Sequence, residues 1–418
     1  MKEMSQTATA TTPPFRLDEK LHQILYKPAK PILEPVHVPE VMPDPPYPIH
    51  TDGKIMTKGE YQKLNAIRTW KTWGKPYFQS RWKSKELRPL IPYLFTEWKC
   101  NLDCHYCWSY NNKVKGMTED VAKRSIDWLH SIGSRVLALM GGEPLLRPKF
   151  IHKIAYYSAQ KGIFVYLPTN GRLMTEDVID RLGDAGLATF NLAVDSVKDN
   201  KALPKALEPI RSKFDYLVKQ QHKYGYTVMF NINICKSNME DVKELTHIAH
   251  ESGIATDYHI NETPMMEQTH FKHLEVNSTY LTPDDFPKVD ALLDYLNDLR
   301  VNQGYKMVNP IRHMEDMKIL MRGEVPQWKC RAGQNSLIIR TDGTLAPCFP
   351  MYSATHDWGA IENPKFDVKQ LDEMKVECSK HCLSTCNYIL AYCYDTARVL
   401  KWVARQSRHG FRGVTDTI

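Results

Sequence analysis

Between residues 90 and 260, strand-like and helix-like patterns alternate at a regular pace, and this alternation limits the possible folds. Buried-strand patterns occupy residues 90–96, 135–140, 163–168, 187–194, 226–234 and 254–260. Amphipathic patterns between them predict helices over residues 118–131, 149–161, 175–185, 204–224 and 239–252. Such a repeat predicts parallel strands joined by right-handed crossovers, in either a doubly wound sheet or a barrel.

A three-cysteine loop follows the first of these strands. Cys100, Cys104 and Cys107 have the spacing C-x3-C-x2-C, so one short loop can surround a metal centre from three sides. A tetrahedral zinc site or a four-cysteine iron–sulfur cluster needs a fourth ligand, and the loop has none beside it. The spacing therefore predicts a cubane cluster with one open iron, which can bind a further ligand. A structural zinc loop is the alternative.

The second strand ends in Gly141-Gly142-Glu143-Pro144, 34 residues after Cys107. Glycines allow the backbone to approach a ligand closely, and backbone carbonyls together with Glu143 can accept hydrogen bonds from an ammonium group. Taken alone, the two glycines could also form an ordinary turn. The cysteine loop and this motif together resemble the radical S-adenosylmethionine (radical SAM) superfamily.

The resemblance implies a partial (β/α)6 barrel with its site at the carboxyl ends of the strands. Cys100, Cys104 and Cys107 would hold a [4Fe-4S] cluster, whose open iron chelates the amino and carboxylate groups of S-adenosylmethionine. Reductive cleavage would give a 5′-deoxyadenosyl radical that abstracts hydrogen from a substrate, while the protein supplies placement. We expect a peptide or protein substrate for oxidation or bond formation. The alternatives are a small metabolite, tetrapyrrole or isoprenoid-like lipid, or a non-enzymatic iron–sulfur or zinc protein. The sequence identifies no catalytic side chain.

Polar residues at further strand ends are candidate cofactor contacts. Thr169 and Asn170 follow the third strand, Asp195 follows the fourth, and Asn231 and Asn233 lie on the fifth at period two. The two asparagines therefore point to one face, which we expect to be the inner one. Asn-Gly and Asp-Ser pairs also favour ordinary turns. The lone Cys235, just past the fifth strand, fits either a hydrogen-donating residue or a small packing residue.

A second group of cysteines begins at Cys330 and Cys348, which flank two strand-like runs around Asp342-Gly343. This pair predicts a hairpin that brings the two thiols together. The Gly343-to-Cys348 spacing, G-x4-C, resembles the SPASM and twitch extensions of radical SAM enzymes. Cys378, Cys382, Cys386 and Cys393 add further soft ligands for an auxiliary iron–sulfur cluster.

The later cysteines depart from the full SPASM pattern, because their spacing is C-x3-C-x3-C-x6-C. Two fully ligated cubanes would need eight thiolates, and this region has six. We expect one auxiliary cluster on Cys330, Cys348 and two of Cys378, Cys382 and Cys386. A second, incompletely ligated cluster, a three-thiolate helical face over 378–386 and a zinc site remain as alternatives.

The chain therefore divides into five expected segments: a proline-rich arm (1–53), a basic aromatic helical cover (54–89), the radical SAM partial barrel (90–325), the auxiliary-cluster domain (326–395) and a basic C-terminal helix and tail (396–418). The cover's aromatics could pack on the barrel or bind an anionic or lipid-like substrate. The C-terminal helix could be solvated or contact an acidic substrate or a membrane surface.

Composition narrows location and partners. No apolar run approaches the ~18–20 residues of a spanning helix, and the N-terminus lacks the apolar core of a secretory signal, so we expect a cytoplasmic protein. A net charge of +7 favours anionic partners without identifying one. The resemblance implies a reducing partner such as flavodoxin or ferredoxin. Contact with a membrane surface is compatible with the sequence, whereas nucleic acid is not expected, because no binding module is recognised.

Overall fold

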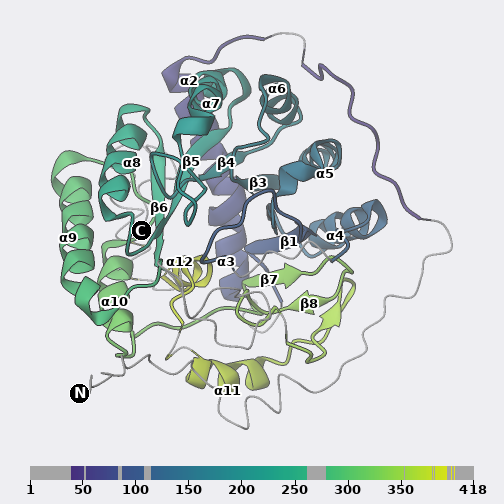
Figure 1. Ribbon diagram of the computed structural model, residues 1–418. Helices are drawn as coiled ribbons and strands as arrows, with labels where there is room; N and C mark the ends of the chain where they lie inside the picture. Colours follow the sequence, from purple (N-terminus) through teal and green to yellow (C-terminus); the bar gives the residue numbers. More distant parts are fainter. Residues whose placement is uncertain are drawn as a thin grey trace, which may run out of the picture.

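The computed structural model describes residues 39–50, 53–82, 87–107, 114–260, 279–352, 354–378, 380, 382–392, 397 and 400. Its centre is an eight-stranded sheet that does not close, with the order β6-β5-β4-β3-β2-β1-β7-β8 (Figure 1). The first six strands are parallel and follow the chain in space: β1 (Ile91–Glu97), β2 (Val136–Gly141), β3 (Phe164–Thr169), β4 (Thr189–Ala193), β5 (Thr227–Ile234) and β6 (Ala255–Ile260). The predicted partial barrel is confirmed.

One helix covers the outer face after each of the first five strands (Figure 1). These are α4 (Glu119–Ser131), α5 (Pro148–Gln160), α6 (Glu176–Asp184), α7 (Arg211–Tyr224) and α8 (Met239–Glu251). The helices α4 and α6 begin where the sequence indicates, because Thr118 and Thr175 accept hydrogen bonds from Val121 N and Val178 N. Beyond β6, α9 (Phe286–Gln303) packs beside α8, and α10 (Ile311–Met321) packs against α9.

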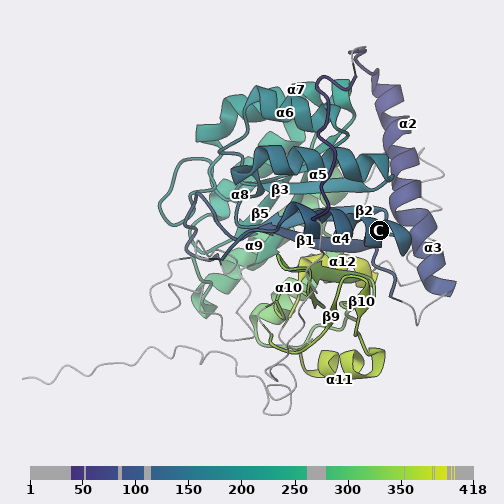
Figure 2. The ribbon, with the colours of Figure 1, turned by 90° about the vertical axis from the view of Figure 1, so that its right-hand side faces the viewer.

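The C-terminal hairpin continues the barrel sheet. The strands β7 (Ser336–Ile339) and β8 (Leu345–Ala346) are antiparallel around Gly343, which has a φ of 85°, as Asp-Gly predicts. The strand β7 also pairs in parallel with β1, which the sequence did not indicate. Beyond the hairpin come β9 (Gly359–Ala360), β10 (Asn363–Pro364), α11 (Val368–Cys378) and α12 (Thr385–Tyr392). In Figure 2 the β9–β10 ribbon and α11 lie on the side of the molecule opposite α6 and α7.

Aromatic packing fixes this C-terminal region against β1. The ring of Tyr352 lies 4.4 Å from that of Phe95 and 4.8 Å from that of Trp98, centroid to centroid. Trp98 Nε1 also donates a 3.0 Å hydrogen bond to the Tyr352 hydroxyl. Phe349 packs edge-on against Tyr93 at 4.8 Å. Since offset and edge-on aromatic pairs add to the stability of area burial, the hairpin and barrel share one core.

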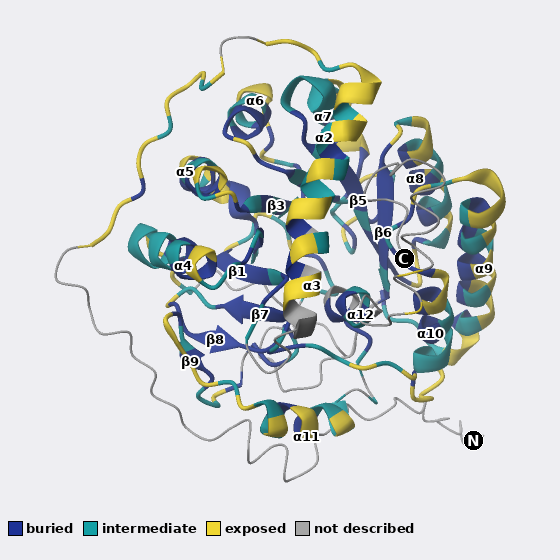
Figure 3. Cartoon of the chain, turned by 180° about the vertical axis from the view of Figure 1, so that it is seen from behind, coloured by how far each residue is buried: buried dark blue, intermediate teal, exposed yellow. Residues whose placement is uncertain are grey.

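A nearly continuous helix crosses the amino ends of the strands (Figure 3). It consists of α2 (Lys58–Thr69), the π-turn Trp70–Gly74 and α3 (Lys75–Trp82). Tyr61 OH donates to the carbonyl of Tyr226 (2.8 Å) and the Arg68 guanidinium donates to that of Ala188 (3.3 Å); both carbonyls lie just before strands. One expectation for the helical cover is that its aromatic side chains pack on the barrel. Trp70 and Phe78 do not, because both face outward and are exposed.

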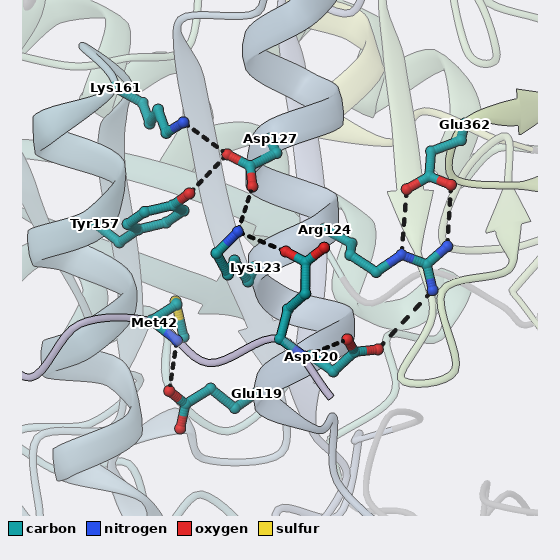
Figure 4. A network of polar contacts seen from close by, with 10 residues as sticks. Met42, Glu119, Asp120, Lys123, Arg124, Asp127, Tyr157, Lys161 and Glu362 are labelled. Carbon is teal, nitrogen blue, oxygen red and sulfur yellow. Dashed lines mark hydrogen bonds and ion pairs between the residues drawn. The ribbon is translucent and has the colours of Figure 1, made fainter. Parts of the chain in front are cut away.

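Residues 39–50 of the proline-rich arm run along the outer helices. Met42 is buried, its N–H donates to Glu119 Oε1 (2.7 Å), and Lys123 forms ion pairs with Glu40 and Asp127 (Figure 4). On the other side of α4, Arg124 pairs with Glu362 beside β10 at 3.0 Å. The helix α4 thus joins the arm to the C-terminal region. Residues 1–38 lie outside the described residues.

Within the described ranges, no helix combines the length and the apolar character needed to cross a lipid bilayer.

Gly141 offers a test of how β1 and β2 pack. A Cβ there would lie 1.8 Å from the backbone oxygen of Glu97, and Gly141 has a φ of 146°. We expect Gly141→Ala to lower the free energy of unfolding by about 3 kcal/mol or more, because backbone must shift. Gly162→Ala is the matched control: its φ is also positive, 69°, but nothing lies near its Cβ, so about 1 kcal/mol is expected. Equal losses in chemical denaturation would contradict the close approach.

Candidate functional site

The three-cysteine loop lies at the carboxyl end of β1, where barrel sites are built. Cys104 is buried, and Cys100 and Cys107 are half-buried. The loop is folded by backbone contacts: Cys107 N–H donates to the carbonyl of Cys104 (3.0 Å), and Leu102 N–H donates to Cys100 Sγ (3.4 Å). Burial raises the pKa of Cys100 to about 11 and also raises that of Cys104. Metal binding would therefore release protons from these thiols.

The Gly141-Gly142 turn lies directly against the segment that leads into the cysteine loop. Gly142 N–H donates to the carbonyl of Glu97, and Glu143 N–H donates to that of Lys99, both at 2.8 Å. A Cβ on Gly142 would lie 2.1 Å from the Lys99 oxygen, so a side chain does not fit. The two motifs, separate in sequence, form one backbone unit.

Glu143 connects this unit to the end of β3. Its buried carboxylate accepts hydrogen bonds from Leu145 N (2.9 Å), Thr169 Oγ1 (2.8 Å) and Asn170 N (2.8 Å), while burial raises its pKa. Asn170 in turn donates through Nδ2 to Asn101 Oδ1 (2.8 Å) in the cysteine loop. A carboxylate has about four acceptor positions, of which three are used by the protein. Glu143 therefore positions three loops, in addition to any ligand contact.

A hydrogen-bonded ionic group connects to the cysteine loop through Tyr106, and the sequence did not reveal it. Lys205 Nζ donates to the Tyr106 hydroxyl (2.9 Å), which donates to Asp195, and Asp195 Oδ1 accepts from Asn233 N (2.8 Å). Burial raises the pKa of Asp195. Although burial opposes the charge of Lys205, attraction to Asp195 and the three cysteines raises its pKa. No sequence pattern pointed to Lys205 as a site residue, because it lies in a loop without a recognised motif.

The inner face of the sheet carries polar residues on β4, β5 and β6. Asn191 lies beside Met229, Asn231 beside Asp257, and Asn233 beside His259. The opposite face packs on the helices, as Phe230 does against Phe214 of α7 at 4.9 Å. Asn231 and Asn233 thus share the inner face, as their spacing predicts.

Two side chains of this inner face have unsatisfied acceptors. Asn191 and Asp257 are 2% and 7% exposed, and in the described part of the chain their Oδ1 atoms accept no hydrogen bond. Because buried polar atoms ordinarily have partners, these two oxygens mark the interior as a place for ligand donors. Their positions follow from strand alternation, which could have identified them in the sequence.

The later cysteines flank the hairpin: Cys330 precedes β7, whereas Cys348, Cys378 and Cys382 follow β8. Cys330 and Cys378 interact electrostatically, and the Lys375 ammonium acts on both thiols. Cys348 and Cys382 pack against the core, and Trp328 Nε1 donates to the carbonyl of Cys382 (3.1 Å). Cys386 belongs to α12, where only its backbone is described, and Cys393 lies outside the described residues. The lone Cys235 is fully buried beside Asn233 Nδ2 (3.5 Å), as a packing residue would be.

The three candidate ligands are thiols, which suit an iron–sulfur cluster better than a hard metal ion. The positive charge of Lys205 acts on all three. Across the residues whose placement is described, no three His, Cys, Asp or Glu side chains yet converge to metal-binding distance.

The sequence was compared with family models and with curated proteins. Residues 99–261 match the model of the Radical SAM superfamily. Over 169 residues the chain is 32% identical to the AdoMet-dependent heme synthase of Methanosarcina barkeri, covering 38% of this chain and 47% of the relative. It is 30% identical over 189 residues to the GTP 3′,8-cyclase of Helicobacter pylori, covering 42% and 56%. The chain thus spans about half the length of these curated relatives.

Solved structures agree on the fold. SuiB of Streptococcus suis, solved with S-adenosylmethionine, superposes with a TM-score of 0.51 and 17% identity, covering 77% of this chain and 71% of SuiB. The AdoMet-bound anSMEcpe superposes with a TM-score of 0.50 and 18% identity, covering 70% and 82%. The family match, the cysteine loop at the end of β1 and the six parallel strands identify residues 99–261 as a radical SAM domain, of the superfamily whose cofactors are a [4Fe-4S] cluster and S-adenosylmethionine.

Proposed function

We propose that this protein binds a [4Fe-4S] cluster through Cys100, Cys104 and Cys107 and reductively cleaves S-adenosylmethionine to a 5′-deoxyadenosyl radical, which abstracts hydrogen from a substrate. The observation that carries the proposal is the backbone unit of Glu97–Lys99 with Gly141–Glu143, which places the three-cysteine loop beside the ends of β2 and β3. A reducing partner of the flavodoxin or ferredoxin class supplies the electron.

The cofactor contacts follow from the same geometry. The backbone of Gly141 and Gly142 and the carboxylate of Glu143 would hold the methionine end of S-adenosylmethionine. Thr169 and Asn170 lie beside them, because both donate hydrogen bonds to Glu143. Asp195, Asn231 and Asn233 supply polar groups farther along the rim, suited to a ribose. These side chains hold and orient the ligand, while the cofactor supplies the radical chemistry.

We also propose one auxiliary iron–sulfur cluster in residues 326–395, next to the barrel of residues 90–325. Cys330 and Cys378 already interact, Cys348 and Cys382 lie in the same C-terminal region, and Lys375 provides a cation beside the first two. The fourth ligand comes from Cys382 or Cys386. This cluster would either accept the electron left after hydrogen abstraction or anchor the substrate.

A peptide or protein is the proposed substrate. The support is the breadth of the structural likeness to SuiB, which extends past the barrel: SuiB with its precursor peptide SuiA superposes at a TM-score of 0.51 over 74% of this chain. The unsatisfied oxygens of Asn191 and Asp257 inside the barrel are suited to donors such as peptide N–H groups.

A tetrapyrrole is the second candidate, because two curated relatives carry such names. They are the AdoMet-dependent heme synthase at 32% identity and the Fe-coproporphyrin III synthase of the same organism at 27%. These matches cover 38% and 41% of this chain and less than half of each relative.

The proposed reaction predicts 5′-deoxyadenosine as a product. After anaerobic cluster reconstitution, adding dithionite and S-adenosylmethionine should release it, and chromatography with mass detection measures it. Cys104→Ala should abolish the product because the cluster loses one of three ligands. Val289→Ala is the control: it truncates a fully buried side chain on the outer helix α9, outside the cysteine loop and the proposed cofactor contacts, and should keep the product. Undiminished product from Cys104→Ala, or none from the reducible wild-type cluster, would refute the proposal.

The substrate class requires a separate measurement. Short peptides encoded next to the gene, incubated with the active protein, should change mass by loss of hydrogen or by an added bond. A titration with iron coproporphyrin is the comparison, since binding would shift the Soret absorption band. A stoichiometric Soret shift with no mass change in any peptide would replace the peptide proposal by the tetrapyrrole one.

Lys205 should tune the cluster, because its ammonium acts on all three cysteines. A nearby cation stabilises the more negative, reduced state, so Lys205→Met should lower the midpoint potential of the reconstituted cluster by roughly 60 mV, a tenfold change in a one-electron equilibrium. Lys205→Arg keeps the charge and should restore most of the potential. Spectroelectrochemistry measures both variants. An unchanged potential in Lys205→Met with full iron content would contradict this role.

A further inference from the structure

The helix that crosses the amino ends of the strands buries polar side chains on its inner face and exposes large apolar side chains on its outer face. Its inner face buries Asn65, Thr72 and Pro76. Its outer face carries Ile67, Trp70 and Phe78, which are 45%, 59% and 48% exposed. Apolar side chains of this size on the outward side of a surface helix usually mark a binding surface.

The outer apolar side chains form one continuous stripe. The rings of Trp70 and Phe78 lie 6.3 Å apart, although eight positions separate them in sequence. Gly74 between them leaves room for the Trp70 ring, since a Cβ there would lie 2.5 Å from Trp70 Cε3. We call Ile67, Trp70 and Phe78 the aromatic stripe.

A basic cavity lies beside this stripe. Its volume is about 290 Å³, and ten described residues from the helix and from the segments before β1 and β2 line it. Four of them are cationic, Lys71, Lys75, Arg88 and Arg135, and none is Asp or Glu. Lys71, Lys75 and Gln79 recur every four residues, so they share one side of the helix, next to the stripe. The cavity is thus built for an anionic group.

We infer that this face docks the protein on an anionic lipid membrane surface. Lipid phosphates enter the basic cavity, while Trp70 and Phe78 lie among the headgroups with Ile67, as aromatic rings do at membrane interfaces. Each cation near such a surface adds electrostatic attraction. The aromatic stripe adds apolar contact with the lipid, which a soluble phosphate ion cannot make. This combination favours a lipid surface over free phosphate or an acidic protein.

The geometry is compatible with catalysis at the other end of the barrel. The helix and cavity lie at the amino ends of the strands, whereas the cysteine loop lies at their carboxyl ends. A docked protein would therefore keep its site open to substrate and reductant. The inference does not depend on the proposed reaction, and its failure would leave that proposal unchanged.

Vesicle flotation of the full-length protein tests the inference. The protein should float with vesicles of phosphatidylglycerol and phosphatidylcholine, but not with phosphatidylcholine alone. Lys71→Gln with Lys75→Gln should weaken the binding about 25-fold, at roughly fivefold for each lysine. Trp70→Ala with Phe78→Ala should also weaken it severalfold, because the rings no longer insert. The matched control changes a lysine and an exposed apolar residue on α11, Lys369→Gln with Val376→Ala, and should bind as the wild type does.

Circular dichroism melting verifies that each variant is folded, which is expected because the four positions are exposed. Absence of anionic-vesicle binding by the wild type would overturn the inference, as would an equal loss in the α11 control. If the lysine variant loses binding but the aromatic variant does not, and inorganic phosphate competes fully, the cavity is a soluble-anion site and the membrane inference is wrong.

Discussion

The close backbone contact between the end of β1 and the turn after β2 is the constraint on which the rest of the site depends. Gly142 N and Glu143 N donate to the carbonyls of Glu97 and Lys99, and neither Gly141 nor Gly142 has room for a Cβ. This contact brings the cysteine loop to the glycine turn. Glu143 then carries the connection to Thr169 and Asn170, so one buried carboxylate aligns three strand ends.

The two cysteine groups share one electrostatic feature, which is a lysine that interacts with their thiols. The Lys205 ammonium interacts electrostatically with the first three cysteines, and the Lys375 ammonium interacts with Cys330 and Cys378. Thiolates and reduced clusters are anionic, and a buried cation nearby offsets part of the cost of burying that charge. Each cysteine group therefore has its own half-buried lysine, although the two groups lie on different parts of the chain.

Local patterns predicted much of the fold and part of the site. Amphipathic periods located α4 and α6, and Asp342-Gly343 located the hairpin, because these features depend on near neighbours. The pairing of β7 with β1 could not be predicted, since it depends on the Tyr352 cluster formed across more than 200 residues. Lys205 and the outward Trp70 were missed for a related reason: tertiary position gives them their character.

The central claim is that Cys100, Cys104 and Cys107 hold a [4Fe-4S] cluster whose fourth iron, which has no cysteine ligand, binds S-adenosylmethionine. Electron–nuclear double resonance on the reduced, reconstituted protein tests it most directly, with the cofactor labelled with ¹⁵N in its amino group. A direct hyperfine coupling from that nitrogen to the cluster, absent in Cys104→Ala, is the predicted result. A reduced cluster that shows no coupling in the presence of saturating cofactor would contradict the account.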